Sequence, residues 1–80
     1  MDYSKMAISE IALHIYTDWA KPNYAAKPYL RAMTEIDNIK DMYFADSATS
    51  VVAYFLGNAR TWRGPVAKAI KAELNKRLKS

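Results

Sequence analysis

The chain has 80 residues, of which 51% are hydrophobic, and its net charge is +4. This length suits one domain with one core, so we expect residues 1–80 to form a single helical domain. The sequence contains no cysteine, which excludes disulfides and thiolate metal sites and suits a reducing cytoplasm. No stretch approaches the apolar length of a membrane span, and the N-terminus lacks a secretion-signal pattern, so we expect a cytoplasmic protein.

The first expected helix covers about residues 4–19. Ser4 is suited to cap its N-terminus, because a hydroxyl can accept a hydrogen bond from an unpaired backbone N–H. Pro22 disfavours helical geometry at Lys21 and therefore ends this helix. Apolar residues at three- and four-residue steps predict one buried stripe, formed by Ile8, Ile11, Ala12, Ile15 and Trp19.

The second expected helix covers about residues 24–36. Pro28 either marks its first turn or bends a helix that begins earlier. The side chains on its predicted apolar side are Ala26, Tyr29, Leu30, Met33 and Ile36. Residues 37–46 are expected to form an irregular connection with room for one helical turn. Its predicted anchors on the core are Ile39, Met42, Tyr43 and Phe44.

The third expected helix covers about residues 47–59, with Asp46 or Ser47 as its cap. Its apolar side chains cover most of the circumference, which is typical of a central, buried helix. They are Val51, Val52, Tyr54, Phe55 and Leu56. The six tyrosines and two tryptophans of the chain are expected to supply core volume.

The fourth expected helix ends near Leu78 and begins at Pro65 or, capped by Thr61, somewhat earlier. Its core stripe is Val66, Ile70, Leu74 and Leu78. The predicted fold is therefore all-α, a compact four-helix bundle-like domain in which the other helices surround a central apolar third helix.

The positive charge is concentrated at the C-terminal end of the sequence. Residues 1–59 have a net charge of −2 and residues 60–80 have +6. The lysines on the side opposite the core stripe are Lys68, Lys71, Lys76 and Lys79. They could neutralise phosphates without reading base sequence, because a lysine provides charge without direction. The alternative is a solvated surface that covers an amphipathic helix.

The junction before the fourth helix, residues 58–64 (NARTWRG), is a second candidate. Arg60, Trp62 and Arg63 are of the residue types that most often dominate binding surfaces, and they lie in a connection between helices. In the alternative interpretation, Trp62 closes the end of the bundle with an arginine packed over its ring.

The remaining polar residues do not form a catalytic or metal-binding set. Asp37, Asp41 and Asp46 lack the spacing of a calcium loop and are expected to make caps and turns. His14 lies one turn from Asp18, but it has neither an adjacent nucleophile nor a second histidine or cysteine for a metal. We therefore expect no catalytic, cofactor-binding or metal-binding residues and no enzymatic activity.

Three segments resemble small uncharacterised helical proteins of Gram-positive bacteria, some of them encoded in phages or mobile elements. These segments are 27–33 (KPYLRAM), 54–59 (YFLGNA) and 61–64 (TWRG). The resemblance implies a bacterial, intracellular accessory protein and gives no catalytic residues. Bacteriocin immunity proteins are similar only in size and fold class.

These patterns favour a small accessory protein that acts as a protein-interaction module. It would bind an unknown protein partner, or a second copy of itself, through Arg60, Trp62 and Arg63. The alternative is a sequence-independent nucleic-acid-binding protein that uses the basic C-terminal helix. Neither function requires a cofactor or a membrane.

Overall fold

The computed structural model describes residues 2–43 and 45–79. Its helices are η1, a 3-10 helix (Tyr3–Lys5), and four α-helices, α1 (Ile8–Asp18), α2 (Lys27–Met33), α3 (Ala48–Gly57) and α4 (Pro65–Leu78). Between α2 and α3 the short strands β1 (Met42–Tyr43) and β2 (Asp46–Ser47) pair antiparallel, with Met42 opposite Ser47. The prediction of a mostly helical domain is confirmed, but the sequence analysis did not reveal the small β-hairpin that these two strands form.

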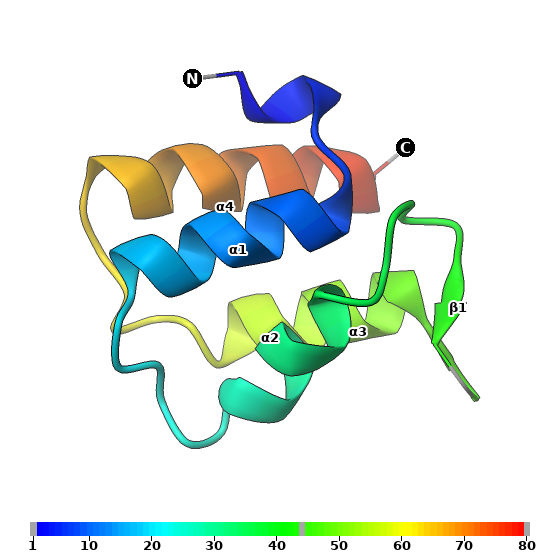
Figure 1. The fold of residues 1–80 in the computed structure, drawn as a ribbon, viewed down its shortest axis with the longest axis horizontal. Helices are drawn as coiled ribbons and strands as arrows, with labels where there is room; N and C mark the ends of the chain where they lie inside the picture. The colour runs from blue at the N-terminus through cyan, green and yellow to red at the C-terminus, as the bar shows by residue number, and fades with distance from the viewer. Residues whose placement is uncertain (1, 44, 80) are drawn as a thin grey trace.

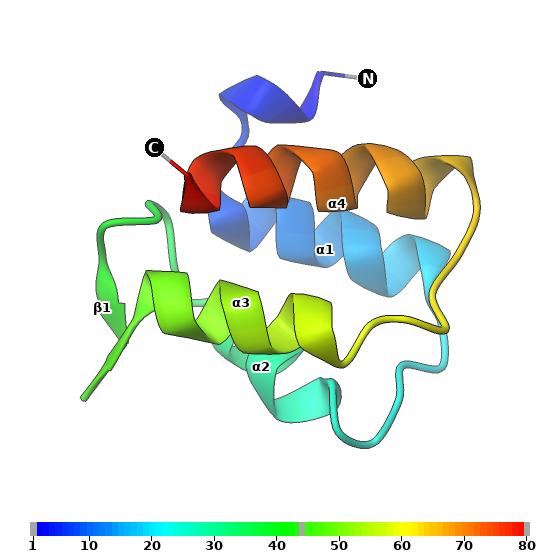
Figure 2. The ribbon, with the colours of Figure 1, turned by 180° about the vertical axis from the view of Figure 1, so that it is seen from behind.

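The four α-helices form two pairs that lie one above the other (Figure 1). The upper pair is α1 and α4, and the lower pair is α2 and α3, as the reverse view also shows (Figure 2). Each of α1 and α3 packs against both α2 and α4. Consequently α2 and α4 lie on diagonally opposite sides of the molecule, and the predicted arrangement around a central third helix is wrong.

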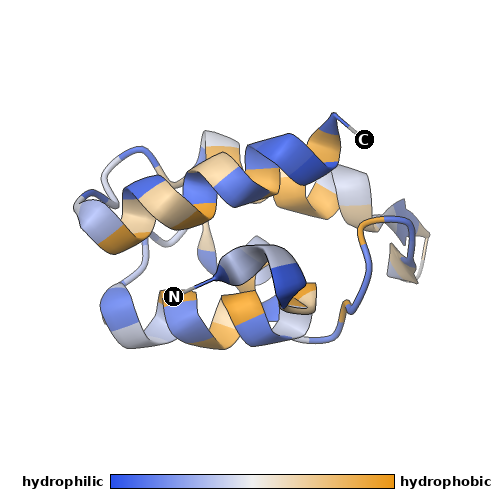
Figure 3. Cartoon of the chain, turned by 90° about the horizontal axis from the view of Figure 1, so that it is seen from above, coloured by the Kyte–Doolittle hydropathy of each residue, from blue (hydrophilic) through white to orange (hydrophobic). Residues whose placement is uncertain are grey.

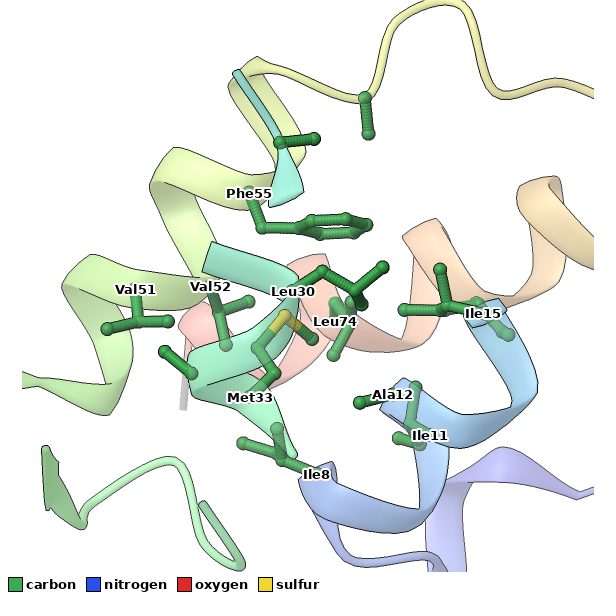
Figure 4. Packing of buried hydrophobic residues seen from close by; sticks show 14 of the residues in the cluster. Ile8, Ile11, Ala12, Ile15, Leu30, Met33, Val51, Val52, Phe55 and Leu74 are labelled. Atoms are coloured by element: carbon green, nitrogen blue, oxygen red, sulfur yellow. The ribbon is translucent and has the colours of Figure 1, made fainter. Parts of the chain in front are cut away.

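The core fills the space between the two pairs, and every α-helix contributes to it (Figure 4). Its largest fully buried side chains include Ile8, Ile11, Ile15, Leu30, Met33, Val52, Phe55, Ile70 and Leu74. Each buried side chain of this size stabilises the fold by about 1.5–3 kcal/mol relative to an exposed one. The predicted stripe of α1 is confirmed from Ile8 to Ile15, while Trp19 is only half-buried.

The first predicted helix is in fact broken into η1 and α1. Asp2, and not Ser4, caps η1, because its Oδ1 accepts a hydrogen bond from the Ser4 N–H (3.0 Å). The backbone is extended at Met6 and at Ala7, the N-cap of α1. The Ala7 N–H donates to Oε1 of Glu10 (3.1 Å), which is the glutamate half of a capping box, while the alanine side chain has no oxygen to supply the other half.

The second helix begins later than predicted, at Lys27, so Pro28 lies in its first turn. This is the first of the two alternatives, and it is favourable because the first turn needs no N–H from the proline. In the following connection Ile39 and Tyr43 pack on the core. Met42 is 64% exposed and is not an anchor. Phe44, the fourth predicted anchor, lies outside the described residues.

The third helix is capped by Ser47, whose Oγ accepts a hydrogen bond from the Ser50 N–H (3.1 Å). Val51, Val52 and Phe55 are buried as predicted, but Tyr54 is 59% exposed. One side of α3 therefore faces solvent.

The fourth helix begins at Pro65, and the earlier start at Thr61 is not realised. Gly64 precedes it with a φ of +115°, a backbone conformation that side-chain-bearing residues rarely adopt. Ile70 and Leu74 are fully buried, while Val66 and Leu78 flank the core. None of the helices in the described ranges combines the length and apolar character needed to cross a membrane.

Candidate interaction surfaces

Trp62, the centre of the predicted junction site, lies in the core. Only 2% of its surface is exposed. Its ring stacks on Trp19, with centroids 5.8 Å apart and an angle of 8°, and meets Phe55 edge to face at 6.3 Å. The structure thus matches the alternative interpretation, in which Trp62 closes the end of the bundle. A side chain buried to this extent offers no contact area to a partner.

Polar contacts hold Trp62 in place. Its Nε1 donates a hydrogen bond to Oδ2 of Asp18 (2.8 Å). The cation over its ring is Lys71, at 5.7 Å from the centroid, and not the expected arginine. The Nζ of Lys71 also donates to the carbonyl oxygens of Ala59 (2.7 Å) and Trp62 (2.6 Å). Burial, and secondarily the charge of Arg63, lowers the pKa of Lys71 from its ordinary value.

A second contact ties the junction to the connection between α1 and α2. The Nδ2 of Asn23 donates to the carbonyl oxygen of Asn58 (3.0 Å), and its Oδ1 accepts a hydrogen bond from Oγ1 of Thr61 (3.1 Å). We call Asp18, Asn23 and Lys71 the clasp, because these three side chains bind the junction from three different elements. Outside the clasp, Arg60 and Arg63 remain exposed.

The predicted lysine surface of α4 is smaller than expected. Lys68, Lys76 and Lys79 are exposed, whereas Lys71 is half-buried and belongs to the clasp. The guanidinium of Arg77 is also bound within the fold and does not add to this surface. Its Nη2 donates to the carbonyl oxygens of Tyr3 (2.8 Å) and Met6 (2.7 Å), and its Nε pairs with Glu73 (2.7 Å). Broad hydrophilic bands mark the C-terminal half of α4 (Figure 3).

The structure does not join His14 and Asp18 as a pair. The His14 ring packs edge to face against Tyr3 (5.8 Å), and Asp18 binds Trp62. The Oδ2 of Asp41 accepts from the backbone N–H of Asn38 (2.9 Å), a turn role of the kind predicted for this carboxylate. Among residues 2–43 and 45–79, no three histidine, cysteine or acidic side chains gather as a metal site would require.

A surface that the sequence did not reveal lies on the side of α2. A cavity of about 760 Å³ is lined by residues from the end of α1, the 19–26 connection, α2 and the hairpin. A second cavity, of about 400 Å³, adjoins it and shares Pro28 and Tyr43 with it. Together they contain five of the six tyrosines of the chain. We call this region the tyrosine surface, defined as Tyr16, Tyr24, Pro28, Tyr29, Tyr43 and Tyr54.

The tyrosines of this surface differ in exposure and in the contacts that they make. Tyr24 is 91% exposed, while Tyr54 stacks on Tyr29 with centroids 5.4 Å apart. The Tyr43 hydroxyl donates to Oε2 of Glu35 (3.0 Å), and this hydrogen bond is the main cause that raises the pKa of Tyr43. Tyr29 and Tyr54, which were expected to supply core volume, therefore lie at its edge.

No sequence window brings these tyrosines together, because they belong to separate elements. The only signal in the sequence is the number of tyrosines, and the helical stripes favoured a core interpretation for two of them. No protein family, curated protein or solved structure matches the chain. The assignment of the tyrosine surface as a candidate binding site therefore depends on the geometry of this molecule alone.

Proposed function

We propose that this protein is a non-enzymatic interaction module that binds a partner protein on the tyrosine surface. The observation that carries the proposal is the gathering of five tyrosines around two adjoining cavities. Tyrosine is enriched in protein interfaces because its ring offers a large contact area and its hydroxyl a hydrogen bond. The proposal keeps the predicted class of function but replaces the Arg60–Arg63 site, since Trp62 is buried.

The exposure of Tyr24 (91%) and Tyr54 (59%) supports a binding role for this surface. Tyr24 contributes almost no buried area to the fold, because 91% of its surface is exposed. The stacked pair of Tyr29 and Tyr54 is already ordered, so binding would not need to immobilise either ring. Large exposed apolar patches on small proteins commonly mark sites of interaction.

The resemblance to small proteins of Gram-positive bacteria and their phages supports an accessory role for such a module. The lack of cysteine in the sequence is compatible with action in a reducing cytoplasm.

The experiment is a selection from a random peptide library on the immobilised protein. The peptides recovered are then measured against the double variant Tyr24→Ser/Tyr54→Ser and against the control Lys68→Ser/Lys76→Ser. All four positions are exposed, so both variants should retain the circular dichroism spectrum of the parent. The proposal predicts peptides that lose binding on the tyrosine variant alone. Peptides that bind both variants equally, or the recovery of none, would contradict it.

Sequence-independent nucleic-acid binding is the second candidate function. It is supported by the exposure of Lys68, Lys76 and Lys79, together with Arg60 and Arg63. It predicts binding to a random DNA duplex that weakens steeply with salt, with a log–log slope that changes by about 0.9 for each lysine removed. Failure to bind a DNA duplex or an RNA strand at low salt would eliminate it.

A further inference from the structure

The larger cavity of the tyrosine surface is positively charged. Lys27 and Arg31 line it, and no acidic side chain does. Glu35, four residues after Arg31, accepts a hydrogen bond from Tyr43. Within the described ranges, neither Lys27 nor Arg31 forms an ion pair with a carboxylate. Both cations are thus available to an anionic ligand.

The two cations are placed side by side along α2. Lys27 and Arg31 are four residues apart, which is about one helical turn, so they project from the same side of the helix. Both are exposed, and Tyr16 and Tyr24 line the same cavity. The volume of about 760 Å³ lies within the range of sites that hold ligands larger than a single ion.

We propose that the segment of the partner that docks in this cavity is an acidic linear peptide. Its carboxylates pair with Lys27 and Arg31, and its apolar side chains pack on Tyr16, Tyr24 and Pro28. The guanidinium of Arg31 is suited to this role because it can bind both oxygens of one carboxylate. This inference rests on the proposed function and adds the chemical class of the partner.

A nucleic-acid strand is the other polyanion that could meet aromatic and basic side chains here. A strand needs a continuous track of cations along its phosphates. The exposed lysines Lys68 and Lys76 lie on α4, and Lys79 follows directly after it. Because α4 is diagonally opposite α2, these lysines do not extend the pair formed by Lys27 and Arg31 (Figures 1 and 2). A site with two cations beside tyrosines and a proline is better matched to a short acidic peptide.

The test measures two properties of the peptides selected on the parent protein, their amino-acid composition and their affinity for charge variants. The first measurement shows whether their sequences are enriched in Asp and Glu relative to the starting library. The second shows whether their affinity falls on Lys27→Glu/Arg31→Glu, with Lys68→Glu/Lys76→Glu as a control that changes the net charge equally. The variant Lys27→Gln/Arg31→Gln removes the charge without reversing it, and circular dichroism verifies the fold of all three.

We expect acidic peptides whose affinity falls about tenfold on Lys27→Glu/Arg31→Glu and changes little on the control. Peptides that require Tyr24 but show no acidic enrichment would overturn the inference and leave the proposed function standing. An equal loss on the control would also overturn it, because the attraction would then be non-specific. Peptides that bind without Tyr24 would contradict the proposed function itself. Single-stranded oligonucleotides that the parent retains and Lys27→Glu/Arg31→Glu loses would replace the peptide with a nucleic acid.

Discussion

The indole Nε1 of Trp62 donates a hydrogen bond to Oδ2 of Asp18 at 2.8 Å, and this contact joins the last residue of α1 to the connection before α4. The two residues are 44 positions apart in sequence. Because the indole is almost completely buried, Asp18 is the acceptor on which its N–H depends.

Replacement of Asp18 by alanine should therefore destabilise the protein. A buried donor that loses its acceptor costs about 1–3 kcal/mol of unfolding free energy. Asp18→Asn keeps an oxygen acceptor at the same position and should cost less. Urea unfolding of both variants measures the difference, with Asp46→Ala, an exposed carboxylate, as the control. Equal stability of Asp18→Ala and the parent would show that this hydrogen bond contributes nothing.

Trp62 and its neighbour Arg63 should differ sharply in their effect on stability. Trp62→Ala removes a ring packed on Trp19 and Phe55, which costs about 3–5 kcal/mol. A domain of this size has a total stability of about 4–12 kcal/mol, so this loss removes a large share of it and should lower the midpoint of thermal unfolding strongly. Arg63→Ala changes an exposed side chain and should alter stability by less than about 0.5 kcal/mol. Thermal unfolding followed by near-ultraviolet circular dichroism separates the two, and a Trp62→Ala variant as stable as Arg63→Ala would contradict the packing role assigned to Trp62.

Replacement of Lys71 by methionine retains the aliphatic stem and removes the ammonium. The carbonyl oxygens of Ala59 and Trp62 then lose a donor each, and the protein should lose about 1–3 kcal/mol of stability at neutral pH. Denaturant unfolding measures this loss. A variant as stable as the parent would contradict the role assigned to the ammonium.

The same lysine should make stability depend on pH. Its folded-state pKa lies below the ordinary value of 10.5, so between the two values the unfolded chain binds more protons. The stability of the parent relative to Lys71→Met should therefore rise as the pH increases from the folded pKa towards 10.5. Unfolding free energies at neutral pH and at about pH 10 test this sign. A difference that shrinks with rising pH would mean that the fold raises the pKa of Lys71.

Asn23 should act on binding as a positioning residue. It lies between Pro22 and Tyr24, which line the larger cavity, and its amide holds Asn58 and Thr61. Asn23→Ala should lower stability by about 1–2 kcal/mol and also weaken the binding of selected peptides, because Tyr24 is then less well ordered. Thr61→Val removes only one of the two hydrogen bonds and should have a smaller effect on both. Unchanged peptide affinity in a folded Asn23→Ala would show that the clasp does not order the tyrosine surface.

The parts of the fold that the sequence predicts are those that depend on local periodicity. Ile8, Ile11, Ala12 and Ile15 are completely buried because spacing along one helix determines its inner side. The cap at Ser47 and the start of α4 at Pro65 are likewise local signals. The pairing of β1 with β2 carries no such signal, since each strand has only two residues.

The candidate sites were harder to predict because they depend on contacts between distant segments. Helical periodicity places Lys71 on the polar side of α4, yet its long stem reaches the carbonyl oxygens of Ala59 and Trp62. The tyrosine surface combines residues from Tyr16 to Tyr54, and only the packing of α1, α2, α3 and the hairpin brings them together.

The most direct test of the tyrosine surface is nuclear magnetic resonance of protein labelled on its tyrosine rings, titrated with a selected peptide. Tyr3 is an internal control, because it packs against His14 and lines neither cavity of the tyrosine surface. We expect shifts of the ring signals of Tyr16, Tyr24 and Tyr43, with Tyr3 and the backbone amides of Lys68, Lys76 and Lys79 unchanged. Shifts confined to Tyr3 or to α4 would contradict this expectation and move the binding site to the opposite side of the molecule.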